Sequence, residues 1–221
     1  MQKRILIFGI FLIAGAVVFL FFSQKSSVTQ IQPISPEVPQ NSAIVSPTNI
    51  APATSPALVF PVSEALSRVT KKPFGIYITP KTSPVSPEKF SGYHTGVDFE
   101  ILAGEENIDV RVSAVCPGQL IYKNYVSGYG GVVIQSCELE GEPVSVLYGH
   151  LRLSSIGAVL NQQIAAGDQL GVLGTGYSSE TDGERKHLHL SVHKGTAVEL
   201  KGYVQSQSVL IAWLDPLTLM R

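Results

Sequence analysis

The stretch Lys186-His187-Leu188-His189-Leu190-Ser191-Val192 decides the fold of this chain. Apolar and polar side chains alternate along it, which is the pattern of a β-strand with one buried face. Residues two apart lie on the same face of a strand, so the two imidazoles lie side by side with the apolar side chains behind them. Adjacent histidines repel each other when protonated. A metal or a shared catalytic role therefore explains the pair better than packing does.

Short strands separated by turns extend through residues 59–221. Two apolar runs, 120–122 and 131–134, flank the turn 127–130 and predict a β-hairpin. We expect further strands at three other apolar runs, 144–148, 169–173 and 187–192. A weak stretch around 64–69 indicates a short helical turn. The pattern predicts an all-β, antiparallel, sandwich-like domain.

Two further motifs contain histidine. His94 and Asp98 form a His-x-x-x-Asp motif, and both are zinc-ligand types that an intervening glycine, Gly96, can allow to converge. The second motif is Tyr148-Gly149-His150, at the end of an apolar strand. Each motif alone is weak, because a loop histidine with a turn-capping aspartate, or a histidine at a rim, explains it equally well.

Taken together in this order, the three motifs resemble the lysostaphin/LytM-type zinc endopeptidases of bacterial cell walls. Other segments are similar to that family too: a Phe-Gly before the first motif, a strand and turn after it, a glycine-rich hairpin, paired glycine signatures and a C-terminal Asp-Pro. These segments are 72–75, 112–120, 128–134, 167–174 and 213–216. The resemblance covers most of residues 59–221 and implies a peptidase domain with a central groove.

The resemblance also implies roles for five residues. His94, Asp98 and His189 would hold one Zn²⁺ per domain and leave a fourth position for water, which is the arrangement of a catalytic zinc site. His150 and His187 would flank that water, relay its proton and stabilise the oxyanion. The sequence leaves open which of the two is the general base.

One segment departs from the family pattern. A longer, charged stretch, 178–186, precedes the His-Leu-His motif, and we expect Arg185 and Lys186 to lie in a solvated loop, with contact to a substrate carboxylate as the alternative. Tyr93 and Tyr148 are near ligand positions and could donate a hydrogen bond at the groove, although half-buried packing explains them as well. His193 lies about 13 Å beyond His189 at strand rise, so we interpret it as a rim or surface residue.

The N-terminal part of the chain differs in composition from the rest. Residues 1–22 contain Lys3 and Arg4 followed by an uncharged run, 5–22, long enough as a helix to cross a bilayer. We predict an uncleaved, single-pass anchor in the bacterial cytoplasmic membrane, with a cleaved signal peptide as the alternative. Residues 23–58 contain six prolines and are rich in Ser, Thr and Gln, which predicts a disordered linker. With this topology, we expect residues 59–221 to form the peptidase domain outside the cytoplasm.

Charge and composition narrow the possible partners. The chain has 221 residues and a formal net charge of −1, which argues against a nucleic-acid partner. The expected function is a membrane-tethered zinc endopeptidase whose partners are peptidoglycan peptides. The alternatives are a catalytically quiet scaffold or activator of other wall hydrolases with the same fold, and a zinc enzyme that acts on a non-wall peptide.

Cys116 and Cys137 are the two cysteines, and export would allow a disulfide between them. If Asn124 pairs with Gly131 across the hairpin, Cys137 lies opposite Gly118, and the two cysteine Cα atoms are about 7 Å apart on the diagonal. A bulge or turn at 117–118 would close the remaining gap. The hairpin therefore predicts a disulfide, with two small buried apolar residues as the alternative.

The uncharged run at 5–22 gives a prediction about topology. The full-size protein should fractionate with membranes, and protease added outside the cytoplasmic membrane should digest the C-terminal domain. Cell fractionation and N-terminal sequencing check both points. A mature N-terminus between residues 20 and 30 would instead indicate a cleaved signal.

Overall fold

The computed structural model describes residues 58–221, and the predicted anchor and nearly all of the predicted linker lie outside this range. No helix within residues 58–221 is long and apolar enough to cross a membrane. The helices and 3₁₀ turns are short, and strands dominate. In chain order the elements are α1 (Ala65–Arg68), β1 (Tyr77–Ile78), β2 (Gly92–His94), β3 (Gly96–Glu100), β4 (Arg111–Ser113), β5 (Gly118–Val126), β6 (Gly130–Leu139), β7 (Glu142–Leu151), η1 (Leu153–Ser155), β8 (Gln163–Ile164), β9 (Gln169–Val172), η2 (Ser179–Thr181), β10 (His187–Lys194), β11 (Tyr203–Val204), α2 (Gln207–Leu210), β12 (Trp213–Leu214) and α3 (Pro216–Leu219).

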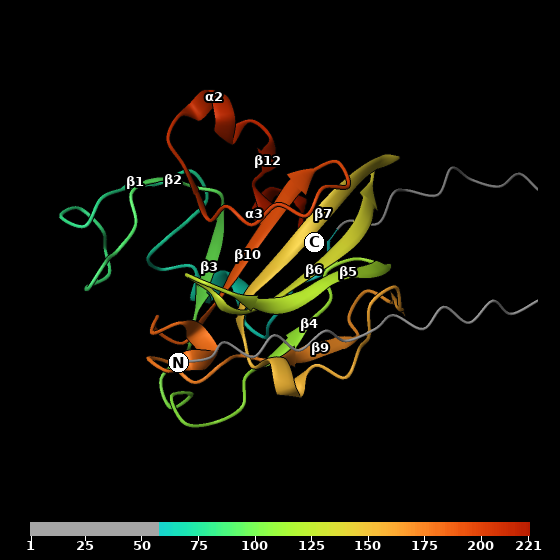
Figure 1. The fold of residues 1–221 in the computed structure, drawn as a ribbon, viewed down its shortest axis with the longest axis horizontal. Helices are drawn as coiled ribbons and strands as arrows, with labels where there is room; N and C mark the ends of the chain where they lie inside the picture. Colours follow the sequence, from blue (N-terminus) through green and yellow to red (C-terminus); the bar gives the residue numbers. More distant parts are fainter. Residues whose placement is uncertain (1–57) are drawn as a thin grey trace, which may run out of the picture. The chain divides into compact units, whose positions relative to one another are not determined.

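One large antiparallel sheet forms the centre of the domain (Figure 1). Its strands follow the order β12-β10-β7-β6-β5-β8, and β3 also pairs with β10. Two smaller antiparallel sheets contain β1-β2-β11 and β4-β9. The predicted all-β antiparallel class is confirmed, and so are the short helical turn at α1 and the predicted strands at β7, β9 and β10.

The hydrophobic core joins the large sheet to the β4-β9 pair. Leu188 and Leu190 of β10 are fully buried, and they belong to one apolar cluster with Val112 of β4 and Leu170 of β9. This cluster lies on the face of β10 that the alternation in the sequence predicts to be apolar. The opposite face of β10 is therefore left to the histidines.

The start and end of the described chain are paired with each other. Leu58 forms a parallel bridge with Met220, and its N–H donates to the carbonyl of Leu219 at 2.9 Å. The side chain of Leu58 is fully buried in the core. The predicted linker, 23–58, is therefore one residue too long at its end, because Leu58 packs with the domain.

The β5-β6 hairpin confirms the predicted hairpin but corrects its register. Gly131 pairs with Tyr125 and not with Asn124. A bulge at Ile121 then shifts the pairing by one residue, so that Gln119 lies opposite Ser136. Between this bulge and the cysteines the register agrees with the predicted one, which places Cys137 opposite Gly118. The bulge lies within β5, whereas we had expected one at 117–118.

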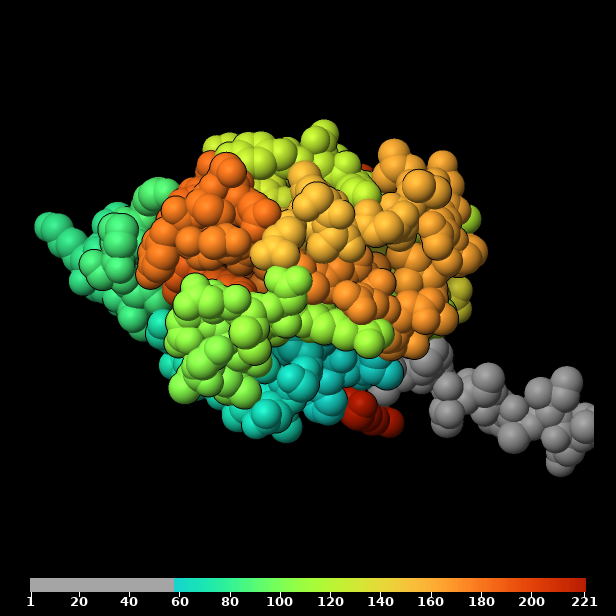
Figure 2. All heavy atoms as spheres, turned by 90° about the horizontal axis from the view of Figure 1, so that it is seen from below, coloured from blue at the N-terminus to red at the C-terminus, as the bar shows by residue number. Residues whose placement is uncertain are grey.

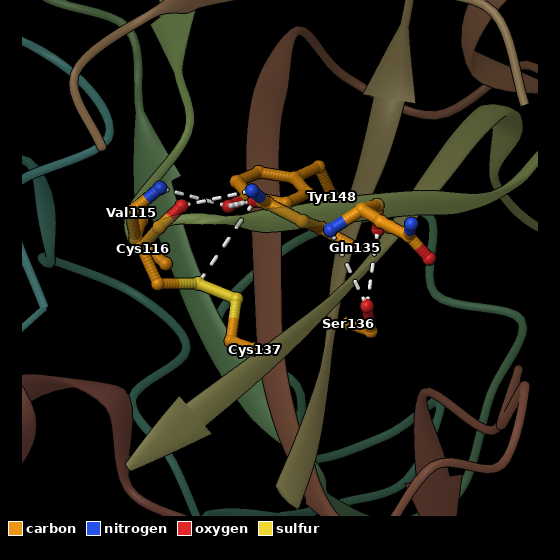
Figure 3. The surroundings of a disulfide bond; sticks show 7 residues. Val115, Cys116, Gln135, Ser136, Cys137 and Tyr148 are labelled. Carbon is orange, nitrogen blue, oxygen red and sulfur yellow. Dashed lines mark hydrogen bonds between the residues drawn. A yellow bond between two sulfur atoms is a disulfide. The ribbon is translucent and has the colours of Figure 1, made fainter. Parts of the chain in front are cut away.

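Cys116 and Cys137 form the predicted disulfide, with their Cα atoms 6.1 Å apart. A buried polar network surrounds the bond (Figure 3). The Tyr148 hydroxyl accepts from the N–H of Val115 at 2.8 Å and donates to the Gln135 amide oxygen at 3.0 Å. The Gln135 amide donates in turn to the Cys116 carbonyl at 2.8 Å. The disulfide and this network together fasten the segment before β5 to β6 and β7.

Removing the disulfide should destabilise the domain without unfolding it. The bond joins residues 21 apart, and in the chain-entropy model this closure contributes about 3 kcal/mol. Cys116→Ala combined with Cys137→Ala should lower the free energy of unfolding in urea by this amount, followed by the fluorescence of the single tryptophan, Trp213. A reductant should lower the stability of the wild type and leave the double variant unchanged. Two alkylated cysteines in unreduced protein exported by its native host would refute the bridge.

Candidate metal centre

Three buried side chains converge at one point of the domain. His94 ends β2, Asp98 is in the middle of β3 and His189 is in β10. The Nε2 atom of His94 lies 3.0 Å from Nδ1 of His189 and 3.2 Å from Oδ1 of Asp98. The same Oδ1 lies 3.1 Å from Nδ1 of His189. The three donor atoms thus form a nearly equilateral triangle.

Strand pairing brings these side chains together. β3 and β10 are antiparallel, and Asp98 lies directly opposite His189 in their register. Gly96, two residues before Asp98 on β3, lies opposite Ser191 of β10. A Cβ atom at Gly96 would collide with the Leu190 carbonyl and would meet His189 Nε2 at 2.9 Å. Glycine is therefore needed here for close approach of the two strands, and not for a turn as the motif alone indicated.

The donor set fits a zinc ion. Imidazole nitrogen and carboxylate oxygen are zinc ligands, and tetrahedral coordination at ordinary bond lengths places ligand atoms about 3.3 Å apart. Within residues 58–221, His94, Asp98 and His189 are the three side chains whose ligand atoms cluster as a metal site requires. All three are buried. The triangle is therefore a candidate site for one metal ion with three protein ligands.

Hydrogen bonds and burial act on the two histidines of the triangle. Nδ1 of His94 lies 3.2 Å from the Pro73 carbonyl, which can only accept, so the proton is on Nδ1 and Nε2 is free. Nε2 of His189 lies 3.4 Å from the Tyr129 hydroxyl. Burial disfavours the charged imidazolium and lowers the pKa of His189 to about 4. Its ring is therefore neutral near pH 7.

Asp98 is ionised at the same pH. Burial alone would raise the pKa of its carboxyl, but the positive charge that His187 and His94 can carry, together with hydrogen bonds from His187 and His189, keeps this pKa well below its usual value. A buried carboxylate with one oxygen facing two imidazole nitrogens completes the donor set.

His187 and His150 lie beside the triangle, as the sequence predicted. His187 precedes His189 by two residues on the same face of β10, and its ring centroid is 4.2 Å from that of His150. Nδ1 of His187 lies 2.8 Å from the Arg185 carbonyl and therefore carries a proton. Its Nε2 lies 3.3 Å from Oδ2 of Asp98.

A bulge in β7 aims His150 at the site. Gly131 pairs with Leu151 but Val132 pairs with Gly149, so His150 is the extra residue, and it adopts the left-handed φ of 62°. Such backbone strain in a non-glycine residue is frequent at functional sites. Nδ1 of His150 is buried and has no hydrogen-bond partner among residues 58–221, and burial lowers the pKa of this ring well below its ordinary value. His150 is therefore a neutral base with an unused ring nitrogen.

A groove of about 300 Å³ opens onto these residues. Its lining includes Asp98, His150, His187 and His189 but not His94. The walls also contain Tyr129 and Tyr203, to which the sequence analysis assigned no role. The ring of Tyr203 lies 5.2 Å from that of His94, and the hydroxyl of Tyr203 accepts from Lys72 at 3.0 Å. Tyr129 lies in a Gly-Tyr-Gly turn, which was its one signal in the sequence.

Tyr148, Tyr93 and His193 lie in three different surroundings. Tyr148 is fully buried on the core side, at the disulfide, so packing is the correct interpretation for it and a groove contact is wrong. Tyr93 is half-buried and its ring lies 4.8 Å from that of Tyr77. His193 is half-buried against Trp213, away from the other four histidines, which agrees with a residue at the rim.

The solvated-loop expectation for Arg185 and Lys186 is wrong. Both residues are buried. Arg185 pairs with Asp98 and Glu100, and the Lys186 ammonium donates to the carbonyls of Glu105 and Ile108. Their partners lie on β3 and on the loop after it, far from these two residues in sequence. The charge of the two side chains predicted solvent exposure because the sequence does not reveal such distant partners. In Figure 2 the orange surface of this loop lies beside the green surface of residues 101–110.

The strand fold, the groove and the donor triangle together describe a β domain with a candidate metal site beside a groove. Residues 92–200 match the model of Peptidase family M23, so this part of the chain is an M23 peptidase domain. The resemblance to the lysostaphin/LytM-type family that the motifs indicated is thereby confirmed.

Several solved structures are similar to the chain at low identity. For Helicobacter pylori Csd3 the identity is 20%, over 75% of this chain and 35% of that chain, with a TM-score of 0.46. For LytU the identity is 21%, over 67% of this chain and 81% of that chain, with a TM-score of 0.46. For lysostaphin from Staphylococcus simulans the identity is 21%, over 72% of this chain and 52% of that chain, with a TM-score of 0.44. The chain thus spans about a third of the Csd3 chain and about half of the lysostaphin chain. No curated protein sequence matches the chain.

The triangle predicts how zinc binding responds to substitution. The wild-type chain should bind about one zinc ion, His189→Ala should abolish binding because two ligands remain, and His150→Asn should leave it nearly intact. Asparagine suits this test because it tolerates the left-handed backbone at position 150. Metal analysis of the purified variants measures the stoichiometry. Stoichiometric zinc in His189→Ala protein would overturn the ligand assignment.

Proposed function

We propose that the chain is a membrane-tethered zinc endopeptidase that hydrolyses peptide bonds of peptidoglycan during cell-wall remodelling or lysis. The observation that carries the proposal is the buried triangle of His94, Asp98 and His189 with two further histidines beside it on a groove. The family match of residues 92–200 supports a peptidase. The zinc ion, the endopeptidase activity and the wall substrate are the parts that we propose.

His94 Nε2, Asp98 Oδ1 and His189 Nδ1 would hold the metal. When bound, zinc supplies Lewis-acid polarisation of a carbonyl and acidification of water toward neutral pH. The ligands come from three strands of the domain and are buried, so they are held in place before a substrate arrives. Such preorganisation avoids the cost of assembling the site during the reaction.

His150 and His187 would divide the proton chemistry between them. His150 is neutral and has an unpartnered ring nitrogen, so it is suited to accept the proton of the attacking water. Nδ1 of His187 carries a proton that it directs to the Arg185 carbonyl, and its Nε2 lies 3.3 Å from Oδ2 of the Asp98 carboxylate. That ring is suited to donate to the negative charge that develops on the scissile carbonyl oxygen. This assigns the general base, which the sequence left open, to His150.

The groove would hold an extended peptide. Tyr129 and Tyr203 line the groove beside the histidines, and Gly128 and Gly202 belong to the same lining. The Lys72 ammonium in the lining is already paired with Glu88 at 2.5 Å. The groove therefore offers aromatic walls and internally paired charge to the substrate.

The proposed setting is the outer face of the cytoplasmic membrane. The apolar run at 5–22 would anchor the chain, and the proline-rich segment after it would space the domain from the bilayer. As a flexible coil this segment spans roughly 35 Å, and roughly 100 Å if it is extended as polyproline. Both lengths would let the groove reach wall peptides from a fixed anchor.

Digestion of purified peptidoglycan tests the proposal. The full-length chain loaded with zinc should release fragments with new peptide termini that mass spectrometry identifies. His150→Asn and His187→Ala should keep zinc and lose activity, by about 10²–10⁴-fold for the base. Removal of zinc by a chelator should abolish cleavage, and added zinc should restore it.

The alternatives predict different results of this digestion. A zinc-loaded, folded chain that cleaves no peptidoglycan but accelerates another wall hydrolase would be a scaffold or activator. A chain that cleaves peptides but not peptidoglycan would act on a non-wall substrate. Equal activity in the wild type and in His150→Asn would contradict the assignment of the base.

A further inference from the structure

The two oxygens of the Asp98 carboxylate have separate sets of partners. Oδ1 faces the triangle and lies 3.2 Å from His94 Nε2 and 3.1 Å from His189 Nδ1. Oδ2 faces away from it, accepting from Nη2 of Arg185 at 2.7 Å and lying 3.3 Å from His187 Nε2. The carboxylate is therefore divided between a metal-facing oxygen and an oxygen held by the protein.

Arg185 is itself fixed by a second carboxylate. Its Nε lies 3.0 Å from both oxygens of Glu100, two residues after Asp98 on β3, and Nη2 also donates to Glu100. One guanidinium thus bridges two carboxylates of the same strand. Bidentate arginine–carboxylate pairs of this kind are geometrically specific and stronger than neutral hydrogen bonds. Burial of all three groups keeps water from competing.

Contacts to two other segments hold the loop that carries Arg185. The Asp182 carboxylate of this loop accepts from the N–H of Gly128, on the β5-β6 turn, at 2.6 Å. The Thr181 hydroxyl donates to the Glu184 carbonyl at 2.7 Å within the loop, and Lys186 donates to carbonyls after β3. The stretch that departs from the family pattern therefore delivers a rigidly held guanidinium to the candidate metal centre.

These contacts limit how Asp98 can bind a metal. A carboxylate can coordinate through one oxygen or two, and two-oxygen binding here would require Oδ2 to leave Arg185. That exchange would leave a buried guanidinium short of a partner, which is costly. We propose that Arg185 is a positioning residue that keeps Asp98 a single-oxygen ligand, so that a coordination position stays open. The proposal rests on the zinc site of the proposed function.

The test compares variants of the full-length chain by metal binding and not by activity. Arg185→Met removes the guanidinium, so that Oδ2 loses its shortest contact and keeps the one to His187 Nε2 at 3.3 Å. We expect zinc affinity, measured by competition with a chromophoric chelator, to fall about 10–100-fold, as is typical when a ligand's supporting partner is lost. With Co²⁺ in place of zinc, we expect the visible bands of the variant to weaken, because a two-oxygen aspartate raises the coordination number.

Two variants serve as matched controls. Arg152→Met removes an arginine that pairs with Glu180 of the same loop and with Asp109 but does not touch Asp98, so it should leave both readouts unchanged. Arg185→Lys keeps the charge but cannot bridge two carboxylates, so it should restore the cobalt spectrum only partly. If Arg185→Met does not fold, Arg185→Met combined with Glu100→Gln removes the unpaired charge and carries the same test.

The outcomes separate this proposal from the proposed function. Zinc affinity and a cobalt spectrum equal to wild type in the folded Arg185 variants would overturn the positioning role, whatever the activity. A wild type that binds zinc but cleaves no peptidoglycan would overturn the function and leave this test readable. A wild type that binds no zinc would overturn both.

Discussion

The antiparallel pairing of β3 with β10 is the constraint on which the rest of the site depends. It places Asp98 opposite His189 and requires glycine at position 96, because a larger residue would separate the strands. The same pairing puts His187 opposite Glu100, next to the carboxylate that holds Arg185. A one-residue slip would turn every histidine of β10 into the apolar core, so burial of Leu188 and Leu190 fixes the register.

The second feature of the site is that its buried charges are matched within the fold. Arg185 lies between two carboxylates of β3, and Lys72 pairs with Glu88 at the groove wall. Removing one partner from such a pair leaves an uncompensated buried charge, whereas the complete set fixes geometry. The three candidate ligands, the two histidines beside them and the residues that pair with them therefore form one connected polar layer above the apolar core.

Part of this structure could be predicted from the sequence because it follows a local period. Alternation along 187–192 predicted the strand and its histidine face, and the order of the motifs indicated the family. The bulge at His150 and the bulge at Ile121 could not be predicted, since a register shift depends on the partner strand. Arg185 was expected in solvent because its carboxylate partners are 85 or more residues away in sequence. The contact between the Tyr129 hydroxyl and His189 Nε2 likewise joins residues 60 apart in sequence.

Anomalous scattering at the zinc edge from crystals of the zinc-loaded chain tests the central claim most directly, because it locates the metal independently of activity. The account predicts one peak about 2.0–2.2 Å from His94 Nε2, Asp98 Oδ1 and His189 Nδ1, with Asp98 Oδ2 still on Arg185. A peak at any other group of side chains, or a metal held by both oxygens of Asp98, would contradict it.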